Sequence, residues 1–201
     1  MTVLAAIAMT VAASALAPAA QAAEFHSGYA NMALQGTADG TGKNAHHVID
    51  FAGASLTCGV ATFSGSKIGA TTNLLILEPQ YANCTFVGQS ASVSTLGCSY
   101  WVRSYGSVDI NCALPMTVSI PSPSCTVSIS SQSGLSAATF ANIKPGSIRE
   151  ITMSLSLTGM KYTATGAGCP ETGTKSNGNY TTGNTIVMAL EKGENLDLWW
   201  E

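Results

Sequence analysis

A short run of aromatic and charged side chains in the middle of the chain carries the most suggestive chemistry. Trp101, Arg103 and Tyr105 stand at alternate positions, and Asp109 follows shortly after them. Residues two apart on a β-strand lie on the same face. Flat aromatic rings flanked by polar groups can stack on a sugar or on a protein partner. We therefore take Trp101, Arg103, Tyr105 and Asp109 as candidate ligand-binding residues.

The alternative for this cluster is that a second sheet or a loop covers it, because a strand of a β-sandwich can be covered on both faces. Trp199 and Trp200 near the end of the chain raise the same question. The sequence leaves both interpretations open.

The histidines do not form a recognisable metal site. His46 and His47 are adjacent, so on a strand they would point to opposite faces. No Cys-x-x-Cys or His-x-x-x-His spacing occurs. We expect His47 to lie in a surface loop, and we expect no bound metal and no cofactor.

Two further motifs resemble functional sites only in part. The stretch Asp39-Gly-Thr-Gly-Lys-Asn44 places oxygen atoms at alternate positions, as in a calcium loop, but it lacks the closing glutamate that such a loop needs. Ser64-Gly-Ser-Lys67 matches a Ser-x-x-Lys motif without the partner motifs or the helix that this chemistry requires. We interpret the first as a turn and exclude the second as a catalytic site.

The elements that would position the candidate residues show a period of two. Apolar side chains alternate with polar ones over 98–102, 108–112, 116–120 and 125–129, which indicates strands with one buried and one exposed face. A single register places every apolar side chain on one face. It pairs Val102 with Val108, Tyr100 with Ile110, Cys98 with Cys112, Cys112 with Met116, Ile110 with Val118, Ile120 with Cys125 and Val118 with Val127.

Further strands are expected on both sides of this region. The pattern predicts strands at 48–51, 55–63, 72–77, 81–87, 151–157 and 184–190, at most a short one near 30–34, and alternation over 196–200. It predicts that Leu74–Leu77 is buried on both faces, that Pro79 ends a strand, and that Gly159 forms a bulge. It predicts a turn at 132–136 and a long polar loop at 169–179. Roughly ten short antiparallel strands favour a disulfide-stapled β-sandwich.

The chain opens with a long apolar run followed by Ala20-Gln-Ala22, the pattern of a secretory signal peptide with cleavage after Ala22 or Ala23. The alternative is an uncleaved anchor. We expect 1–23 to be the signal peptide, 24–201 to be one domain, and no membrane span after cleavage. Because only 9% of residues are charged and the net charge is −3, nucleic acid is a poor partner.

All 6 cysteines follow the predicted cleavage site, and in a secreted chain an even number indicates disulfides. The register favours Cys98 with Cys112. Chain order then favours Cys58 with Cys84, which leaves Cys125 with Cys169. The main rival pairs Cys112 with Cys125 and Cys98 with Cys169.

The order of these features is similar to that of a group of uncharacterised secreted β-rich proteins of soil actinobacteria. The similarity rests on Pro79-x-Tyr81-x-x-Cys84, Cys98-x-Tyr100, Val108-x-Ile110-x-Cys112, Cys125-x-Val127-x-Ile129-x-x-Gln132, the alternating 151–157 and Cys169. The resemblance implies secretion and an all-β fold. It implies no activity and no catalytic residue.

These observations predict a secreted, extracellular, non-enzymatic β-sandwich that binds a glycan or a surface protein. The first alternative is a structural or matrix protein of the cell envelope without a ligand. The second is a small secreted hydrolase, which the shortage of paired acids and histidines disfavours.

Overall fold

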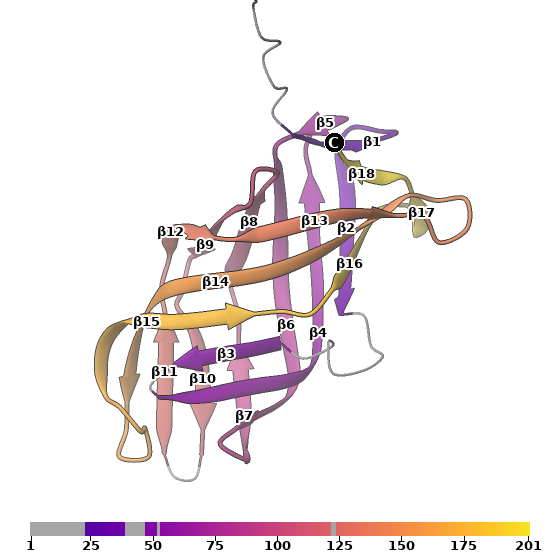
Figure 1. Cartoon of the computed structure of the whole chain (residues 1–201). Coiled ribbons are helices and arrows are strands. Elements are labelled where there is room, and N and C mark those ends of the chain that lie inside the picture. Colours follow the sequence, from indigo (N-terminus) through magenta and orange to yellow (C-terminus); the bar gives the residue numbers. More distant parts are fainter. Residues whose placement is uncertain (1–22, 39–46, 52, 122–123) are drawn as a thin grey trace, which may run out of the picture.

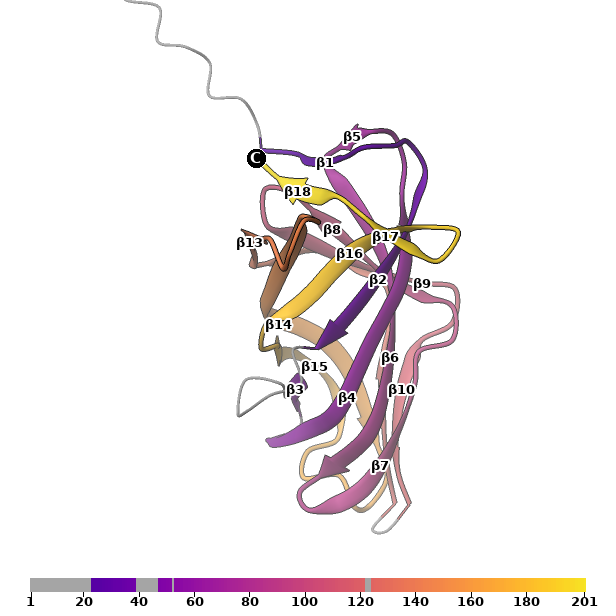
Figure 2. The same cartoon turned by 90° about the vertical axis from the view of Figure 1, so that its right-hand side faces the viewer.

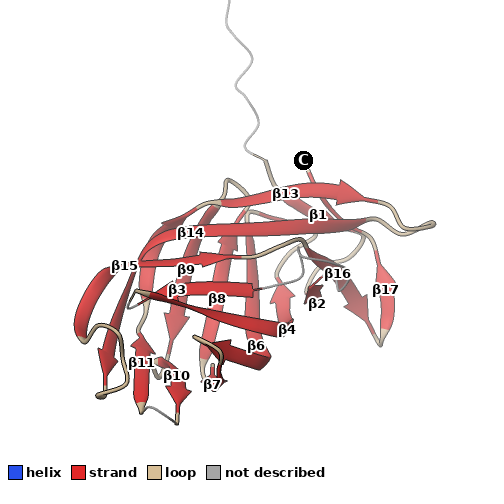
Figure 3. Ribbon diagram, turned by 60° about the horizontal axis from the view of Figure 1, so that its bottom comes forward, coloured by secondary structure: helices blue, strands red, loops and turns tan. Residues whose placement is uncertain are grey.

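Antiparallel strands make up almost all of the regular structure. The computed structural model describes residues 23–38, 47–51, 53–121 and 124–201. The predicted signal peptide up to residue 22 and the Asp39–Asn44 turn lie outside these residues. Within them every regular element is a strand, as Figure 3 shows, so the predicted all-β class is confirmed.

The strands number 18 in the described residues, more than the sequence predicts. They are β1(Phe25–Ser27), β2(Met32–Ala38), β3(His47–Phe51), β4(Ala54–Lys67), β5(Thr71–Thr72), β6(Leu74–Phe86), β7(Gln89–Ser94), β8(Cys98–Arg103), β9(Ser107–Cys112), β10(Met116–Ile120), β11(Cys125–Ile129), β12(Gln132–Ser136), β13(Ala138–Ile143), β14(Glu150–Thr165), β15(Gly173–Thr181), β16(Thr185–Glu191), β17(Glu194–Leu196) and β18(Leu198–Trp200).

The strands are arranged in two layers. β13, β14 and β15 run across β4, β6 and β8 in Figure 1, and the view turned by a right angle separates the two groups (Figure 2). The layers are continuous at their margins, because β14 pairs with β11 and with β16, and β4 pairs with β3. A small sheet of β18, β1 and β5 lies at the end where the C-terminus is marked.

The space between the layers holds the apolar side chains that alternate along the strands. Phe25, Leu56, Leu75, Leu77, Val102, Val108, Val118, Val127, Ile151, Met153 and Leu157 are fully buried. The predicted inward set of the central strands is therefore the observed core. Burial of this apolar surface is the main favourable term in folding.

β6 is one long strand where the sequence predicts two. Pro79 does not end it, because Pro79 is paired with Phe63 of β4 on one side and lies between two different partners on the other. Residues Leu74–Leu77 pair with β8, and Cys84–Phe86 pair with β7. A proline has no N–H to donate, and here none is needed.

The predicted register of the central strands is partly correct. β8 and β9 pair as predicted, from Cys98 with Cys112 to Val102 with Val108, and so do β10 and β11. The predicted pairing of β9 with β10 is wrong. β9 pairs with β8 and β12, whereas β10 pairs with β7 and β11. The segment 113–115 therefore carries the chain from one half of the layer to the other and does not close a hairpin.

Two segments predicted as loops are strands. The predicted turn at 132–136 is β12, which pairs with β9 through a bulge. Most of the predicted loop at 169–179 is β15, which pairs with β14 on one edge and β3 on the other. The bulge predicted at Gly159 is confirmed, since the register of β14 with β15 shifts on both sides of Met160 and Gly159 has a φ of 73°.

Three disulfides are formed, and all three predicted pairs are correct. Cys58–Cys84 joins paired positions of β4 and β6 with a Cα–Cα distance of 3.9 Å, and Cys98–Cys112 joins paired positions of β8 and β9 at 4.0 Å. Cys125–Cys169 ties β11 to the segment after β14 at 4.9 Å.

We expect the Cys125–Cys169 staple to contribute more stability than Cys98–Cys112. The two bonds close loops with sequence separations of 44 and 14. In the chain-entropy model these loops are worth about 4 and about 3 kcal/mol. Urea unfolding of the two double Cys→Ala variants measures the difference. A Cys98→Ala/Cys112→Ala variant that is the less stable of the two would contradict this order.

Gly65 is the position in β4 where a side chain has no space. A Cβ atom there would fall on the backbone carbonyl of Ile76 in the neighbouring strand. We expect Gly65→Ala to lower the free energy of unfolding by about 1–3 kcal/mol, the usual cost of overpacking. Gly28→Ala is the matched control, because nothing lies within 4 Å of its added Cβ. Equal midpoints of urea unfolding for the two variants would show that β4 and β6 are not held this close.

Candidate functional site

Three of the four candidate residues, Trp101, Arg103 and Asp109, share the outward face of β8 and β9. Trp101 is paired with Asp109 across the two strands, and Arg103 is the next residue of β8 on that face. Trp101 and Arg103 are half-buried. Tyr105, in the turn between the strands, is 65% exposed. The outward orientation predicted for Trp101, Arg103 and Asp109 is therefore confirmed.

An ion pair fixes the charged members. Arg103 Nη2 donates to Asp109 Oδ2 at 3.2 Å, and Asp109 Oδ1 accepts from the backbone N–H of Gly134 at 2.8 Å. The second bond ties the middle of β12 to β9. Because the pair is only partly buried, we expect it to hold geometry more than to add stability.

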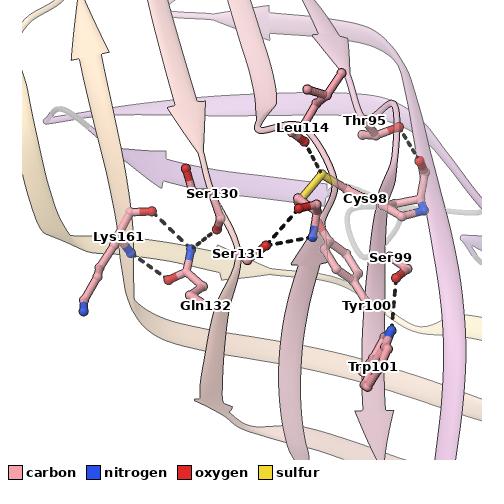
Figure 4. The surroundings of a disulfide bond; sticks show 12 residues. Thr95, Cys98, Ser99, Tyr100, Trp101, Leu114, Ser130, Ser131, Gln132 and Lys161 are labelled. Carbon is pink, nitrogen blue, oxygen red and sulfur yellow. Dashed lines mark hydrogen bonds between the residues drawn. A yellow bond between two sulfur atoms is a disulfide. The ribbon is translucent and has the colours of Figure 1, made fainter.

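A hydrogen bond at the indole nitrogen holds the Trp101 ring in place. Its Nε1 donates to Ser99 Oγ at 3.1 Å, along the same strand (Figure 4). Ile76 of β6 is paired with Trp101 and Leu74 with Arg103, and both are half-buried. The expectation that Leu74–Leu77 is buried on both faces is wrong, because only Leu75 and Leu77 point into the core. Leu74 and Ile76 add an apolar floor to the outward face.

A shallow depression opens beside the indole. It has a volume of about 310 Å³ and is lined by Trp101, Asp109, Ile110, Asn111 and 131–133. Its walls combine one aromatic ring with a carboxylate, amides and hydroxyls. Such a set can hold a ligand that has both apolar faces and hydroxyl groups.

The C-terminal tryptophans differ from Trp101 because neighbouring residues already bind to their rings. The Arg149 guanidinium lies 3.6 Å from the centre of the Trp199 ring, and His26 stacks with the same ring at 5.4 Å. Arg149 also bonds to Asp197 at 3.0 Å. Backbone and side-chain hydrogen bonds from Arg149 hold the pKa of Asp197 below its usual value. Trp200 Nε1 donates to the Ser104 carbonyl at 3.0 Å.

Ser64 and Lys67 are separated by the geometry of β4. Ser64 points to solvent, whereas Lys67 points inward and is 1% exposed. Lys67 Nζ donates to Ser27 Oγ at 3.0 Å and to the carbonyls of Gly69 and Ala70 at 2.5 and 2.7 Å. Burial lowers the pKa of this amine. Lys67 fastens the β4–β5 connection to β1.

His47 is buried, and the expectation of a surface loop is wrong. It begins β3 and shares the inward face with Ile49 and Phe51, leaving only 1% of its surface exposed. Asp50 points to the other face and accepts from Ser55 Oγ at 2.5 Å. The segment 39–46, which includes His46, lies outside the described residues.

A chain of hydrogen bonds runs from His47 through the core. Its Nδ1 lies 2.6 Å from Tyr180 Oη, Tyr81 Oη donates to Tyr180 Oη at 2.8 Å, and Tyr100 Oη is 3.0 Å from Tyr81. A phenol has one proton, so Tyr81, which donates to Tyr180, accepts from Tyr100. Between Tyr180 and His47 the imidazole tautomer sets which atom donates. Burial raises the pKa of all three tyrosines and lowers that of His47 to about 4.

The sequence analysis does not predict this series of hydrogen bonds. The alternation of Tyr100 with Ser99 and Trp101 predicts that its ring points inward, and a buried tyrosine hydroxyl needs a hydrogen-bond partner. This need for a partner is the one sign of the network in the sequence. The partners Tyr81, Tyr180 and His47 come from β6, β15 and β3, and no local pattern links these strands.

The site is identified neither by similarity to known proteins nor by a group of metal-binding side chains in the described residues. Comparison of the chain with family models, with curated proteins and with solved structures found no match. In residues 23–38, 47–51, 53–121 and 124–201, no three His, Cys, Asp or Glu side chains lie close enough to hold a metal ion. No helix in those ranges is long and apolar enough to cross a membrane.

His47 should make the protein sensitive to acid. Its pKa is about 4 in the folded state and 6.5 in the unfolded state. As the pH falls through this window only the unfolded chain takes up the proton, so the stability present above pH 6.5 is lost toward pH 4, by about 3 kcal/mol.

The variant His47→Asn tests this, because an amide can bond to Tyr180 without titrating. We expect it to be less stable than the wild type at neutral pH and to lose less stability between pH 7 and pH 4. Urea unfolding at several pH values measures both slopes. Parallel slopes would show that His47 is not buried as a neutral base.

Proposed function

We propose that the protein is a secreted, non-enzymatic binding domain that engages an extracellular glycan or surface protein through the outward face of β8 and β9. The observation that carries the proposal is Trp101. Its ring borders an open depression, and in the described chain no other ring or guanidinium stacks on it. The Trp199 ring, by contrast, stacks with the side chains of Arg149 and His26. An aromatic ring that borders an open depression beside polar groups is a common anchor for a ligand.

Export is supported by the disulfides and by the predicted leader. Three disulfides stabilise the fold, and such bonds persist in oxidising compartments. The predicted signal peptide precedes the first described strand. The resemblance to secreted actinobacterial proteins agrees with the same location.

A binding role without catalysis is supported by the placement of the acids. Glu78 and Asp109 share the outward face, but β8 lies between their strands and they stand one row apart. Strand spacing and rise put their Cα atoms roughly 12 Å apart. Asp109 is also committed to Arg103 and Gly134.

Replacing both Trp101 and Tyr105 with Ala should abolish binding to a glycan array or to cell-wall preparations. We expect little loss of stability, since neither ring belongs to the core. Tyr29→Ala is the matched control, because Tyr29 is a 56% exposed aromatic in the β1–β2 connection. Binding and thermal unfolding are measured for all three proteins.

Two outcomes would contradict the proposal. A double variant that unfolds would show that the rings stabilise the fold and are not a free surface. A folded double variant that retains wild-type binding would move the site elsewhere.

A further inference from the structure

A second depression lies on the same face as the first, on the other side of β8. It has a volume of about 260 Å³ and is lined by 78–80 of β6 and by 95–99. It opens where Pro79 separates the two partners of β6, and Thr95 Oγ1 donates to the Pro79 carbonyl there at 2.6 Å. Ser99 borders this depression, and its cross-strand partner Asn111 borders the other. The Ser99–Asn111 pair thus contributes one residue to each depression.

The rows of the sheet place the residues of the two depressions side by side. Ile76, Trp101 and Asp109 form one outward row across β6, β8 and β9, and Ser99 and Asn111 form the next. Glu78 stands in that second row on β6, two residues after Ile76. Together with β12 the surface spans four neighbouring strands, and three strand spacings of about 4.8 Å give a length of roughly 14 Å. This is longer than one sugar ring and suits a short oligosaccharide.

The polar groups on this surface are available to a ligand. The side chains of Glu78, Gln80 and Asn111 are exposed and make no hydrogen bond or ion pair with any other described residue. They offer amide donors and acceptors and carboxylate oxygens, which match sugar hydroxyls. The Trp101 ring, which lines the depression over β9, offers a flat apolar surface for the C–H face of a sugar.

The charges disfavour an anionic ligand. The Asp109 carboxylate is neutralised by Arg103, and Glu78 is an unpaired acid. No lysine or arginine lines either depression, and the whole chain carries a net charge of −3. A phosphorylated, sulfated or uronic-acid chain would meet like charge without a compensating cation.

We propose that this double depression binds a neutral linear oligosaccharide lying across β6, β8, β9 and β12. Trp101 stacks on a central sugar ring. Glu78 hydrogen-bonds to the sugar at one end of the oligosaccharide, and Asn111 hydrogen-bonds toward the other end. The inference rests on the proposed binding function and names its ligand class. A monosaccharide fills only part of the surface, so affinity rises with chain length until both depressions are filled.

Isothermal titration with neutral linear oligomers of glucose, xylose, mannose and N-acetylglucosamine, from one to six units, tests the proposal. At least one series should bind more tightly with each added unit and reach a plateau within six. Glu78→Ala and Asn111→Ala should each weaken binding of the longest oligomers about five- to tenfold, as expected for one or two lost hydrogen bonds. Both should leave binding of the shortest ligand and the unfolding temperature unchanged. Glu194→Ala, an exposed acid on β17, is the control.

Three results would overturn it: no binding in any neutral series, affinity independent of length, or preference for charged oligogalacturonate over neutral chains. A failure of this proposal can be distinguished from a failure of the proposed binding function. If no oligosaccharide binds but the protein still attaches to cell-wall preparations in a Trp101-dependent manner, the binding function stands with a protein ligand. If both fail, the outward face is not a binding site.

Discussion

The pairing of β6 is the constraint on which the arrangement of this protein depends. One edge of β6 is paired with β4 for most of its length, and the other edge is shared between β8 and β7. Pro79 stands at the division and cannot donate a hydrogen bond. The layer therefore splits into an upper half, β8, β9 and β12, and a lower half, β7, β10 and β11, as Figure 1 shows. The split divides a long antiparallel layer, and one of the two outward depressions lies at it.

Sequence reasoning succeeded where information is local. Alternating side chains set the faces of β8, β9, β10 and β11, and that register placed Cys98 opposite Cys112. It also placed Trp101, Arg103 and Asp109 outward. It failed where distant strands decide the outcome. The segment Gly173–Thr181 is rich in Gly, Thr and Asn and resembles a loop, but pairing with β14 and β3 makes it a strand. Strand propensity depends on such tertiary neighbours. His47 was missed because its partner Tyr180 is 133 positions away.

Side chains replace strand pairing at several edges. Gln132 Oε1 accepts from the Lys161 N–H at 2.8 Å while its Nε2 donates to the Lys161 carbonyl at 3.1 Å. Asn142 does the same with Trp200, at 2.8 and 2.7 Å. Ser131 Oγ bonds both the N–H and the carbonyl of Cys112, as Figure 4 shows. An unpaired edge is a template for aggregation. These polar side chains satisfy the backbone where no strand arrives, in a chain with few charged residues to protect its edges.

The two faces of β8 connect the core to the proposed binding surface. Adjacent residues on a strand point in opposite directions, so Tyr100 enters the core directly behind Trp101. Its hydroxyl is the first donor in the chain through Tyr81 and Tyr180 to His47, which links β8 to β6, β15 and β3. A fully satisfied buried network favours one arrangement of the strands that carry it. The backbone beneath Trp101 is thus fixed from behind by hydrogen bonds and beside it by the Cys98–Cys112 staple. A face fixed in this way loses little conformational entropy when a ligand settles on it.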